Sequence, residues 1–203
     1  MRVRQTEPVS IDPTHPRDPG SQLATWVVLL RGINVGGRNR VPMAELRAGL
    51  SRRGLTDVRT YIASGNIVLR AADGPDARPR VAGLVEQAVT EDFGVRSSAL
   101  VRPGADVRRI AAAIPTDWVE DADRRCDVLF LFDDVDAPEV LDSLPLVAGV
   151  DTAHYTPGAV LWSVPRDRLT RTGMTRIVGT SLYLRLTIRN IRTTRTLAEL
   201  AAG

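Results

Sequence analysis

The segment from Arg31 to Arg40 carries the residue types that anion-binding loops use. It contains three glycines and three arginines: Gly32, Gly36, Gly37, Arg31, Arg38 and Arg40. Glycine permits positive φ and a close approach of the backbone, so successive N–H groups can form a concave anion-binding site. Guanidinium groups add charge-assisted hydrogen bonds to a phosphate or carboxylate. We therefore predict that this loop binds an anionic group. In the alternative interpretation the glycines only turn the chain, and Asn34 bonds to local backbone as asparagine does in turns.

The helix expected after this loop leaves its first N–H groups free. Pro42 suits the first position of a helix, because its fixed φ matches the helix and its missing N–H is not needed there. Val41 then falls at the N-cap, where a valine side chain cannot accept a hydrogen bond. The loop lacks both the Gly-Lys-Ser/Thr ending of a phosphate-binding loop and the G-x-G-x-x-G spacing of a dinucleotide-binding turn. The sequence thus indicates an anionic ligand but identifies no cofactor.

Two further segments place polar side chains at the expected ends of strands. Ser64-Gly65-Asn66 forms a tight turn that presents a hydroxyl and an amide; alternatively Gly65 serves the hairpin and Asn66 satisfies the turn. Arg189 and Asn190 precede the last helix, where they form a polar clamp or, for Asn190, a helix cap. The complete predicted ligand-binding set is Arg31, Asn34, Gly36, Gly37, Ser64, Asn66, Arg189 and Asn190.

No catalytic or metal-binding residue follows from these patterns. A serine nucleophile at Ser64 needs a nearby base, and the two histidines are His15, near the N-terminus, and His154, in an alternating stretch typical of an exposed strand. The acidic run at 133–136 lacks the glycine and distal glutamate of an EF-hand loop, so a solvated loop is the preferred interpretation. A single cysteine, Cys126, gives no internal disulfide and no basis for a thiolate metal cluster.

The composition is that of an ordinary globular protein. Hydrophobic residues make up 43% and charged residues 25% of the 203 positions, which argues against global disorder. No apolar run approaches the roughly 20 residues that cross a bilayer. Residues 1–22 are interrupted by prolines and lack the apolar segment of a signal peptide. We therefore predict a flexible N-terminal extension at residues 1–22, a cytoplasmic location and no membrane partner.

All 27 basic residues are arginines, and acids balance them unevenly along the chain. Residues 20–70 carry eight arginines against two acids, residues 71–150 eight against sixteen, and residues 151–203 eight against three. A protein that binds nucleic acid non-specifically normally carries a stronger uncompensated charge than this net +3. Nucleic acid is therefore a less favoured partner than a small anionic ligand.

The elements expected in residues 23–103 follow the order β-α-β-β-α-β. Strands are expected at 26–30, 58–62, 67–69 and 95–101, and helices at 42–53 and 80–93. The first and third strands are continuous apolar runs, as in central strands, whereas the second and fourth alternate and carry arginine, as edge strands do. A ferredoxin-like sheet of spatial order 4-1-3-2 places the strands in this way, with both helices on one face. We therefore predict an α+β fold that begins with a ferredoxin-like sandwich.

Residues 104–203 are predicted to form a second α+β subdomain. The expected elements are an apolar strand at 128–132, a hairpin around 157–158, a helix near 172–181, a strand near 182–188 and a terminal helix from about 193. This order resembles a second, degraded β-α-β-β-α-β unit, and whether the two units are a true duplication is left open. Two such units side by side create a concave seam, the usual place for a ligand pocket.

Three segments together resemble the bacterial domain-of-unknown-function family 1697. They are residues 30–37 (LRGINVGG) with 42–46 (PMAEL), residues 58–66 (VRTYIASGN), and residues 187–190 (TIRN) with Thr193. The resemblance covers about residues 24–200 and supports the predicted fold, while the name of the family leaves its function open. The C-terminal segment departs from the family, which places Trp and Asn after the Arg-Asn pair where Ile191 and Arg192 stand here.

Three classes of function remain. The first is a protein, whether enzyme or not, that binds a small anionic ligand at the seam, where the 31–40 loop meets Arg189 and Asn190. The second is a nucleic-acid-binding module, because the RNA-recognition fold has the same element order but stacks bases on aromatic side chains of its central strands. The expected third strand, 66–70 (NIVLR), has no aromatic residue. The third is a regulatory or assembly module that forms oligomers through sheet edges. We prefer the first.

Overall fold

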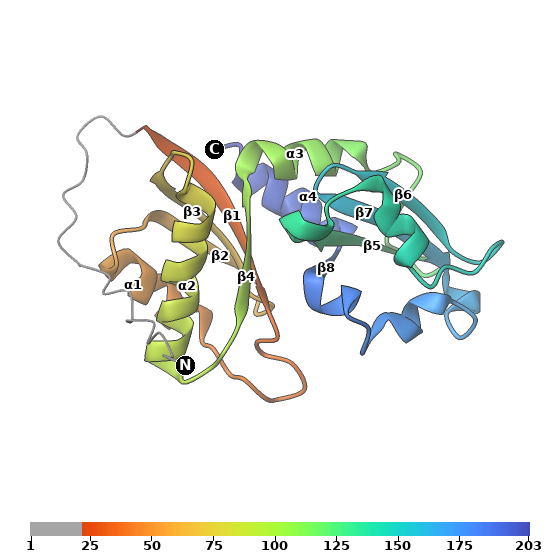
Figure 1. Ribbon diagram of the computed structural model, residues 1–203, viewed down its shortest axis with the longest axis horizontal. Helices are drawn as coiled ribbons and strands as arrows, with labels where there is room; N and C mark the ends of the chain where they lie inside the picture. Colours follow the sequence, from red (N-terminus) through yellow and green to blue (C-terminus); the bar gives the residue numbers. More distant parts are fainter. Residues whose placement is uncertain (1–21) are drawn as a thin grey trace, which may run out of the picture.

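Two four-stranded antiparallel sheets lie side by side in the protein (Figure 1). The computed structural model describes residues 22–203, so the predicted N-terminal extension falls outside the described residues except for its last position. The first sheet and its helices comprise β1 (Leu23–Arg31), α1 (Met43–Arg52), β2 (Thr56–Tyr61), β3 (Asn66–Ala72), α2 (Ala77–Phe93), β4 (Ser98–Pro103) and α3 (Gly104–Ala113). Between residues 22 and 203, no helix has the length and apolar character needed to cross a membrane.

The elements of the second sheet include five 3-10 helices, labelled η. They are β5 (Arg124–Leu131), η1 (Asp133–Val135), η2 (Pro138–Ser143), β6 (Thr152–Thr156), β7 (Ala159–Pro165), η3 (Arg166–Arg168), η4 (Gly173–Ile177), η5 (Leu182–Arg185), β8 (Leu186–Asn190) and α4 (Ile191–Leu200). Short 3-10 helices are therefore the main covering elements of this sheet.

The first sheet confirms the predicted ferredoxin-like topology. Its strand order is β2-β3-β1-β4, so the first and third strands are central and the second and fourth are edges. The apolar run at 26–30 explains this placement, because all five residues are buried and β1 pairs with strands on both sides. Both crossover helices, α1 and α2, lie on the same face of the sheet (Figure 1).

The second sheet repeats this arrangement. Its order is β6-β7-β5-β8, which is the order of the first sheet when the strands are counted from β5. In the places of α1 and α2 it has only 3-10 helices, whereas α3 and α4 follow the last strand of each sheet. The predicted second α+β unit is therefore present, with the same strand order and with shorter covering elements.

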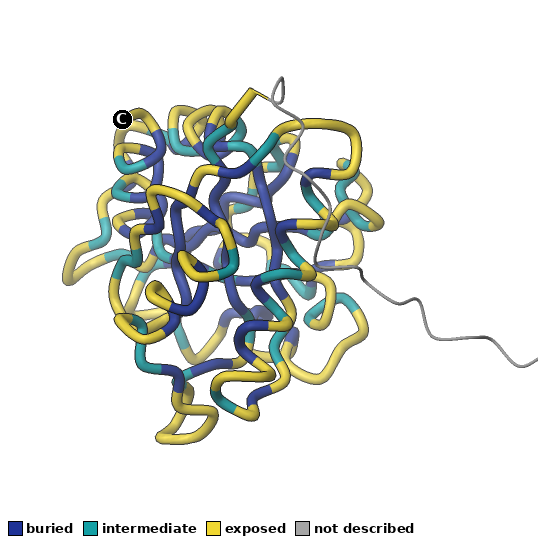
Figure 2. Tube along the Cα trace, turned by 90° about the vertical axis from the view of Figure 1, so that its left-hand side faces the viewer, coloured by how far each residue is buried: buried dark blue, intermediate teal, exposed yellow. Residues whose placement is uncertain are grey.

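The apolar side chains form three layers, one between the sheets and one on each outer face, because alternate side chains of a strand point to opposite faces. In β1, Trp26 and Val28 pack against α1 and α2, whereas Val27 and Leu29 face the second sheet. The central layer also contains the apolar faces of α3 and α4, which pack between the two sheets. The third layer lies on the outer face of the second sheet, beneath the 3-10 helices. Figure 2 shows the buried segments at the centre of the molecule and the exposed ones around them.

Several predicted boundaries are wrong. Pro42, and not Val41, is the N-cap of α1, because Pro42 keeps an extended ψ of 115° and the helix begins at Met43. The predicted helix at 172–181 is only the 3-10 helix η4 followed by a turn, since Val178 is extended and Gly179 has φ +93°. The strand predicted at 182–188 begins at Leu186 after a further 3-10 helix.

Candidate functional site

Asn34 closes the loop that follows β1. Its backbone N–H donates to the carbonyl of Asn39 (2.9 Å), and its side-chain oxygen accepts from the Val41 N–H (2.8 Å). Its side-chain nitrogen donates to the carbonyls of Val41 (3.0 Å) and Ala63 (2.7 Å). Asn34 also has φ +52°, a conformation that asparagine tolerates better than most residues. The structure therefore matches the alternative interpretation of Asn34 as a residue that bonds to local backbone.

Gly36 and Gly37 form the tip of the same loop. Val35 and Arg38 bridge beneath them, with a hydrogen bond of 3.0 Å from the Arg38 N–H to the Val35 carbonyl. Both glycines are exposed with positive φ, and their own N–H groups have no hydrogen-bond partner among residues 22–203. The side chains of Arg38 and Arg40 are also exposed. The tip thus leaves two amides and two guanidinium groups open to solvent.

Arg31, the last residue of β1, reaches the second sheet. Its Nη2 donates to the Tyr183 carbonyl (2.9 Å) and its Nε to the Leu186 carbonyl (3.2 Å). Its guanidinium carbon lies 4.7 Å from the centroid of the Tyr183 ring, within the range of a cation–π interaction. Arg31 therefore positions the segment that leads into β8.

The turn between β2 and β3 requires glycine at position 65. Gly65 has φ +78°, and a Cβ atom there would approach the Leu30 Cβ to 2.7 Å. The carbonyl of Gly65 accepts from the Leu30 N–H (2.8 Å), which ties the turn to β1. Asn66 is fully buried and donates to the Tyr61 carbonyl (3.1 Å) and to the exposed Ser64 hydroxyl (2.9 Å). These contacts agree with the alternative in which Gly65 and Asn66 serve the turn.

Arg189 of β8 joins this turn to the second sheet. The residue is only 9% exposed, yet all five of its N–H groups donate hydrogen bonds. The acceptors are Asn66 Oδ1 (2.5 Å), the Leu30 carbonyl (2.8 Å), the Ser64 carbonyl (3.0 Å), Thr187 Oγ1 (2.9 Å) and the Ile188 carbonyl (2.8 Å). Burial lowers the pKa of Arg189 to about 10, so the guanidinium stays charged at neutral pH. Every acceptor is neutral, and no carboxylate of the described residues pairs with this charge.

Arg102 of β4 is the counterpart of Arg189 in the first sheet. In the strand pairing, Arg102 lies opposite the fifth residue of β1, and Arg189 lies opposite the fifth residue of β5. Arg189 donates to the carbonyl of Leu30, and Arg102 donates to the carbonyl of Leu131 (2.5 Å), which occupies the same position of β5. The two arginines thus cross between the sheets in opposite directions, related by an approximate twofold symmetry.

The symmetry fails in the partners of the two arginines. Arg102 pairs with the carboxylates of Asp133 (3.0 Å) and Asp136 (3.2 Å). Asp134 pairs with Arg185, so all three aspartates of the acidic run are ion-pair partners. Conversely, Asn66 stands opposite the seventh residue of β1, and the matching position opposite β5 holds Ala159. An alanine side chain has no acceptor, so the Nε atom of Arg102 is buried without the kind of hydrogen bond that Arg189 Nε makes to Asn66.

Asn190 caps α4, because its side-chain oxygen accepts from the Thr193 N–H (2.8 Å). The capping interpretation therefore holds for this residue.

Of the predicted set, the structure gathers Ser64, Asn66 and Arg189 around one buried cluster, and Asn34 and Arg31 contact the segments on either side. Gly36, Gly37 and Asn190 take no part in these contacts.

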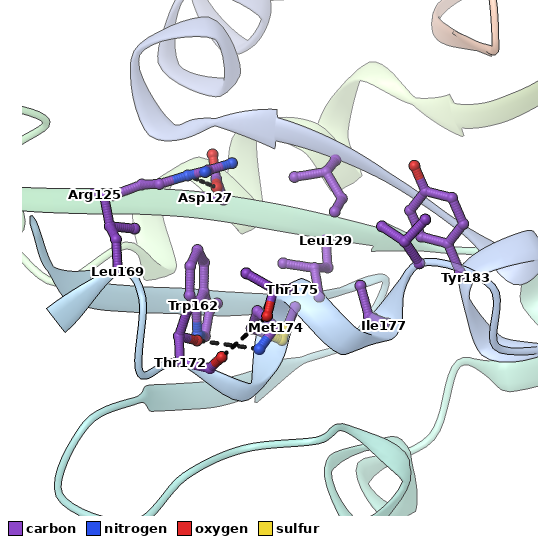
Figure 3. Close-up of a pocket in the computed structure, with 12 residues that line it drawn as sticks. Arg125, Asp127, Leu129, Trp162, Leu169, Thr172, Met174, Thr175, Ile177 and Tyr183 are labelled. Carbon is purple, nitrogen blue, oxygen red and sulfur yellow. Dashed lines mark hydrogen bonds and ion pairs between the residues drawn. The ribbon is translucent and has the colours of Figure 1, made fainter.

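A cavity of about 270 Å³ lies on the outer face of the second sheet. Apolar side chains, among them Leu129 and Ile177, form most of its wall. Figure 3 shows Arg125 and Asp127 together at one end and Tyr183 at the other. No residue of the predicted set lines this cavity. The central apolar layer packs in the seam expected to hold a pocket, and a smaller hollow of about 170 Å³, lined by Thr25, Val68 and Leu200 among others, lies between the first sheet and the end of α4.

The cavity exists because the second sheet departs from the first on its outer face. Two α-helices cover that face in the first sheet, whereas short 3-10 helices cover it in the second. The register places Asp127 of β5 at the position that Trp26 occupies in β1. The Trp26 indole fills the space beneath its helices, and the smaller carboxylate at the matching position of the second sheet lines a cavity.

Asp127 is a buried acid with one oxygen in use. Its Oδ2 accepts from Arg125 Nε (2.7 Å), and its Oδ1 has no hydrogen-bond partner among residues 22–203. Burial raises the pKa of Asp127 above its ordinary value, although the charge and the hydrogen bond of Arg125 act in the opposite direction. Perturbed acids in cavities are candidates for functional groups, because structural packing alone favours an apolar residue there.

Asp151 organises the wall opposite β5. Its carboxylate accepts hydrogen bonds from Trp162 Nε1 (3.0 Å), the Val147 N–H (2.8 Å), the Gly173 N–H (3.2 Å) and the Thr172 hydroxyl. Burial alone raises the pKa of Asp151, but these hydrogen bonds together bring it below the ordinary value. The wall is therefore held by an ionised carboxylate that has no capacity to spare for a ligand.

The sequence offered one signal for this site. Asp127 directly precedes the apolar run of β5, and Arg125 stands two residues earlier, so both side chains fall on one face of the strand. The cavity itself depends on the loose covering by η3 to η5, which periodicity does not reveal. Within the described residues, no group of three or more His, Cys, Asp or Glu side chains is arranged to hold a metal ion.

The model of the family described as "Protein of unknown function (DUF1697)" matches residues 23–162. The chain belongs to this family. The DUF1697 match covers the first sheet and ends within β7, so it includes Arg125, Asp127 and Trp162 of the cavity. No curated protein matches the chain.

A solved structure is similar to this DUF1697 protein over most of its length. It is the conserved bacterial protein SP0830 from Streptococcus pneumoniae, with 26% sequence identity and a TM-score of 0.74. The similarity covers 89% of this chain and 99% of that protein. The α+β fold with two sheets is therefore shared with a bacterial protein.

Substitution of Arg189 tests the buried cluster. We expect Arg189→Met to lower the free energy of unfolding by at least about 3 kcal/mol, because each buried acceptor left without a donor costs about 1–3 kcal/mol. The matched control is Arg192→Met, which removes an exposed arginine of α4 and should change stability by less than about 0.5 kcal/mol. Urea unfolding curves measure both. Equal losses for the two variants would contradict the bridging role of Arg189.

Substitution of Asn34 tests whether this residue is structural. Asn34→Ala is expected to cost about 1–3 kcal/mol of stability, since it removes three side-chain hydrogen bonds and leaves an alanine at positive φ. Arg38→Ala, at the exposed tip of the same loop, is the control and should leave the melting temperature nearly unchanged. An Asn34→Ala variant that melts with the wild type would refute the assignment.

The pH dependence of stability tests the burial of Asp127. Its pKa is higher in the folded protein than in the unfolded chain, so its contribution is full below the ordinary aspartate pKa and is lost as pH rises through the folded value. Asp127→Asn has no such titration. The variant should therefore gain stability relative to the wild type as pH rises from about 4 to 8, measured as melting temperature against pH. A relative loss over that range would show that the carboxylate is stabilised where it lies.

Proposed function

We propose that this protein binds a small molecule in the cavity on the outer face of the second sheet. The proposal rests on one difference between equivalent positions of the two sheets. Trp26 is packed beneath helices in the first sheet, whereas Asp127 lines a cavity in the second. Burying a carboxylate costs free energy unless its oxygens are hydrogen-bonded, and Arg125 engages only one oxygen of Asp127, so a ligand that engages the other lowers this cost.

The character of the cavity agrees with a small-molecule site. Such sites are mostly apolar with a few polar groups that set orientation, and their volumes begin at roughly 300 Å³. A volume of about 270 Å³ suits a compact molecule. The apolar wall, the aromatic rings of Trp162 and Tyr183, and the Arg125–Asp127 pair at one end provide contacts of both kinds.

Arg31 connects this cavity to the first sheet. It fixes Tyr183, which lines the far end of the cavity, through one hydrogen bond to the carbonyl and one contact with the ring. A predicted site residue thus supports the proposed site without touching its ligand.

An anionic ligand at the loop after β1 is the second candidate. Its support is the group of donors that the loop tip leaves open to solvent, where the side chains of Arg38 and Arg40 are exposed. The free N–H groups of Gly36 and Gly37 lie in the loop that corresponds to the acidic loop of the second sheet. An anion held there would accept hydrogen bonds from these amides and pair with the exposed guanidinium groups of Arg38 and Arg40.

Blocking the cavity tests the first proposal. Thr175 lines the cavity and is exposed, so Thr175→Trp should fill it without disturbing the core. In a thermal-shift screen of amino acids, nucleosides, carboxylates and sugar phosphates, we expect a compound that raises the melting temperature of the wild type but not of Thr175→Trp. A ligand at 100 times its Kd stabilises by about 2.7 kcal/mol, which such a screen detects.

The control is Thr170→Trp, an exposed position outside the cavity, which should respond like the wild type. A compound that stabilises all three proteins equally would refute the cavity as its site. If that compound is anionic and its effect disappears when Arg38 and Arg40 are both changed to alanine, the loop is the site instead.

A further inference from the structure

We infer that the cavity takes a free α-amino acid with an apolar side chain. The inference rests on the proposed function and adds the chemical class of the ligand. It follows from the unused hydrogen-bonding groups of Arg125 and Asp127, which lie side by side at one end of a mostly apolar space.

Asp127 offers an acceptor for an ammonium group. Its Oδ2 is taken by Arg125, and its Oδ1 has no partner among the described residues although the side chain is only 7% exposed. An ammonium group donates up to three hydrogen bonds and carries the opposite charge, so it satisfies this oxygen and offsets the cost of burying the carboxylate.

Arg125 offers donors for a carboxylate group. Only its Nε is engaged, so both terminal nitrogens of the guanidinium remain free within residues 22–203. The guanidinium carbon lies 5.7 Å from the centroid of the Trp162 ring, which holds the group beside the cavity. A guanidinium binds a carboxylate through two parallel hydrogen bonds, and the side chain is 47% exposed, so a ligand can reach it.

The two free groups are spaced for a zwitterion. Arg125 Nε and Asp127 Oδ2 are 2.7 Å apart, so an ammonium and a carboxylate on one carbon atom can each meet its partner at the same time. The four charges then alternate in sign. Of the other charges that act on Asp127, Glu120 and Arg166 are paired with each other at 2.9 Å and leave this balance unchanged.

The rest of the cavity selects an apolar side chain. The hydroxyl of Thr172 is used by Asp151 and the Met174 N–H, and the hydroxyl of Thr175 donates to the Thr172 carbonyl. Arg31 lies on the Tyr183 ring at the far end, which disfavours a second positive charge there. Leucine, methionine or phenylalanine side chains therefore suit the space better than charged ones.

A deletion series of ligands tests the inference by calorimetry. The probes are L-phenylalanine, 2-phenylethylamine, which lacks the carboxylate, and 3-phenylpropanoate, which lacks the ammonium group. We expect the wild type to bind L-phenylalanine at least about tenfold more tightly than either probe, as one charge-assisted hydrogen bond implies. Asp127→Asn should reduce L-phenylalanine to the affinity of 3-phenylpropanoate, and Arg125→Gln should reduce it to that of 2-phenylethylamine.

Thr175→Trp separates failure of the ligand class from failure of the cavity. Equal binding of the three probes that is lost in Thr175→Trp overturns the amino acid and keeps the cavity. Binding of L-phenylalanine that survives both Asp127→Asn and Arg125→Gln overturns the inference, and so does the absence of binding by any probe at millimolar concentration. The melting temperature of Asp127→Asn, measured beside its affinity, separates a loss of binding from a loss of folding.

Discussion

The two sheets depend on one buried positive charge that has only neutral partners. Moving the Arg189 guanidinium out of water costs several kcal/mol, and hydrogen bonds to a charged donor return roughly 1.5–3 kcal/mol each, so all five must form together. This demand fixes the turn between β2 and β3, because two acceptors lie in it. The same turn contains Ile62 with φ +48°, which is unfavourable for a β-branched residue and persists only where the surroundings impose it.

The approximate twofold arrangement explains which features are structural and which need another reason. Both sheets share the strand order, the crossing arginine and the helix that follows the last strand. Features common to both halves are those the fold requires. The fold does not require features found in one half only, such as the helices over the first sheet or the acid beneath the second. The cavity belongs to this second group, which is why we place the function there.

Much of the fold could be predicted from the sequence, because local signals agree in the first sheet. The buried run at 26–30 marks a central strand, and Gly65 marks a turn that only glycine can make. The predicted site was less accessible, because asparagine and arginine look the same in a sequence whether they meet a ligand or a carbonyl oxygen. Asn34 is an example, because its side chain makes three hydrogen bonds to backbone groups that lie close to it only in the folded loop. The cavity could not be predicted, because it arises from weakly periodic 3-10 segments.

The two halves also differ in how they satisfy buried polar groups, and this difference bears on the cavity. In the first sheet, Trp26 fills the outer space completely, at the cost of an indole N–H that is buried without a partner. An unmet donor of this kind costs about 1–3 kcal/mol, and the fold tolerates it because the ring buries a large apolar area. The second sheet lacks that apolar area and has instead an acid that lines an open space and has one unbonded oxygen. Packing alone favours the first solution, so the second persists only if something other than packing selects for it, and a ligand that completes the hydrogen bonds of Asp127 is such a selection.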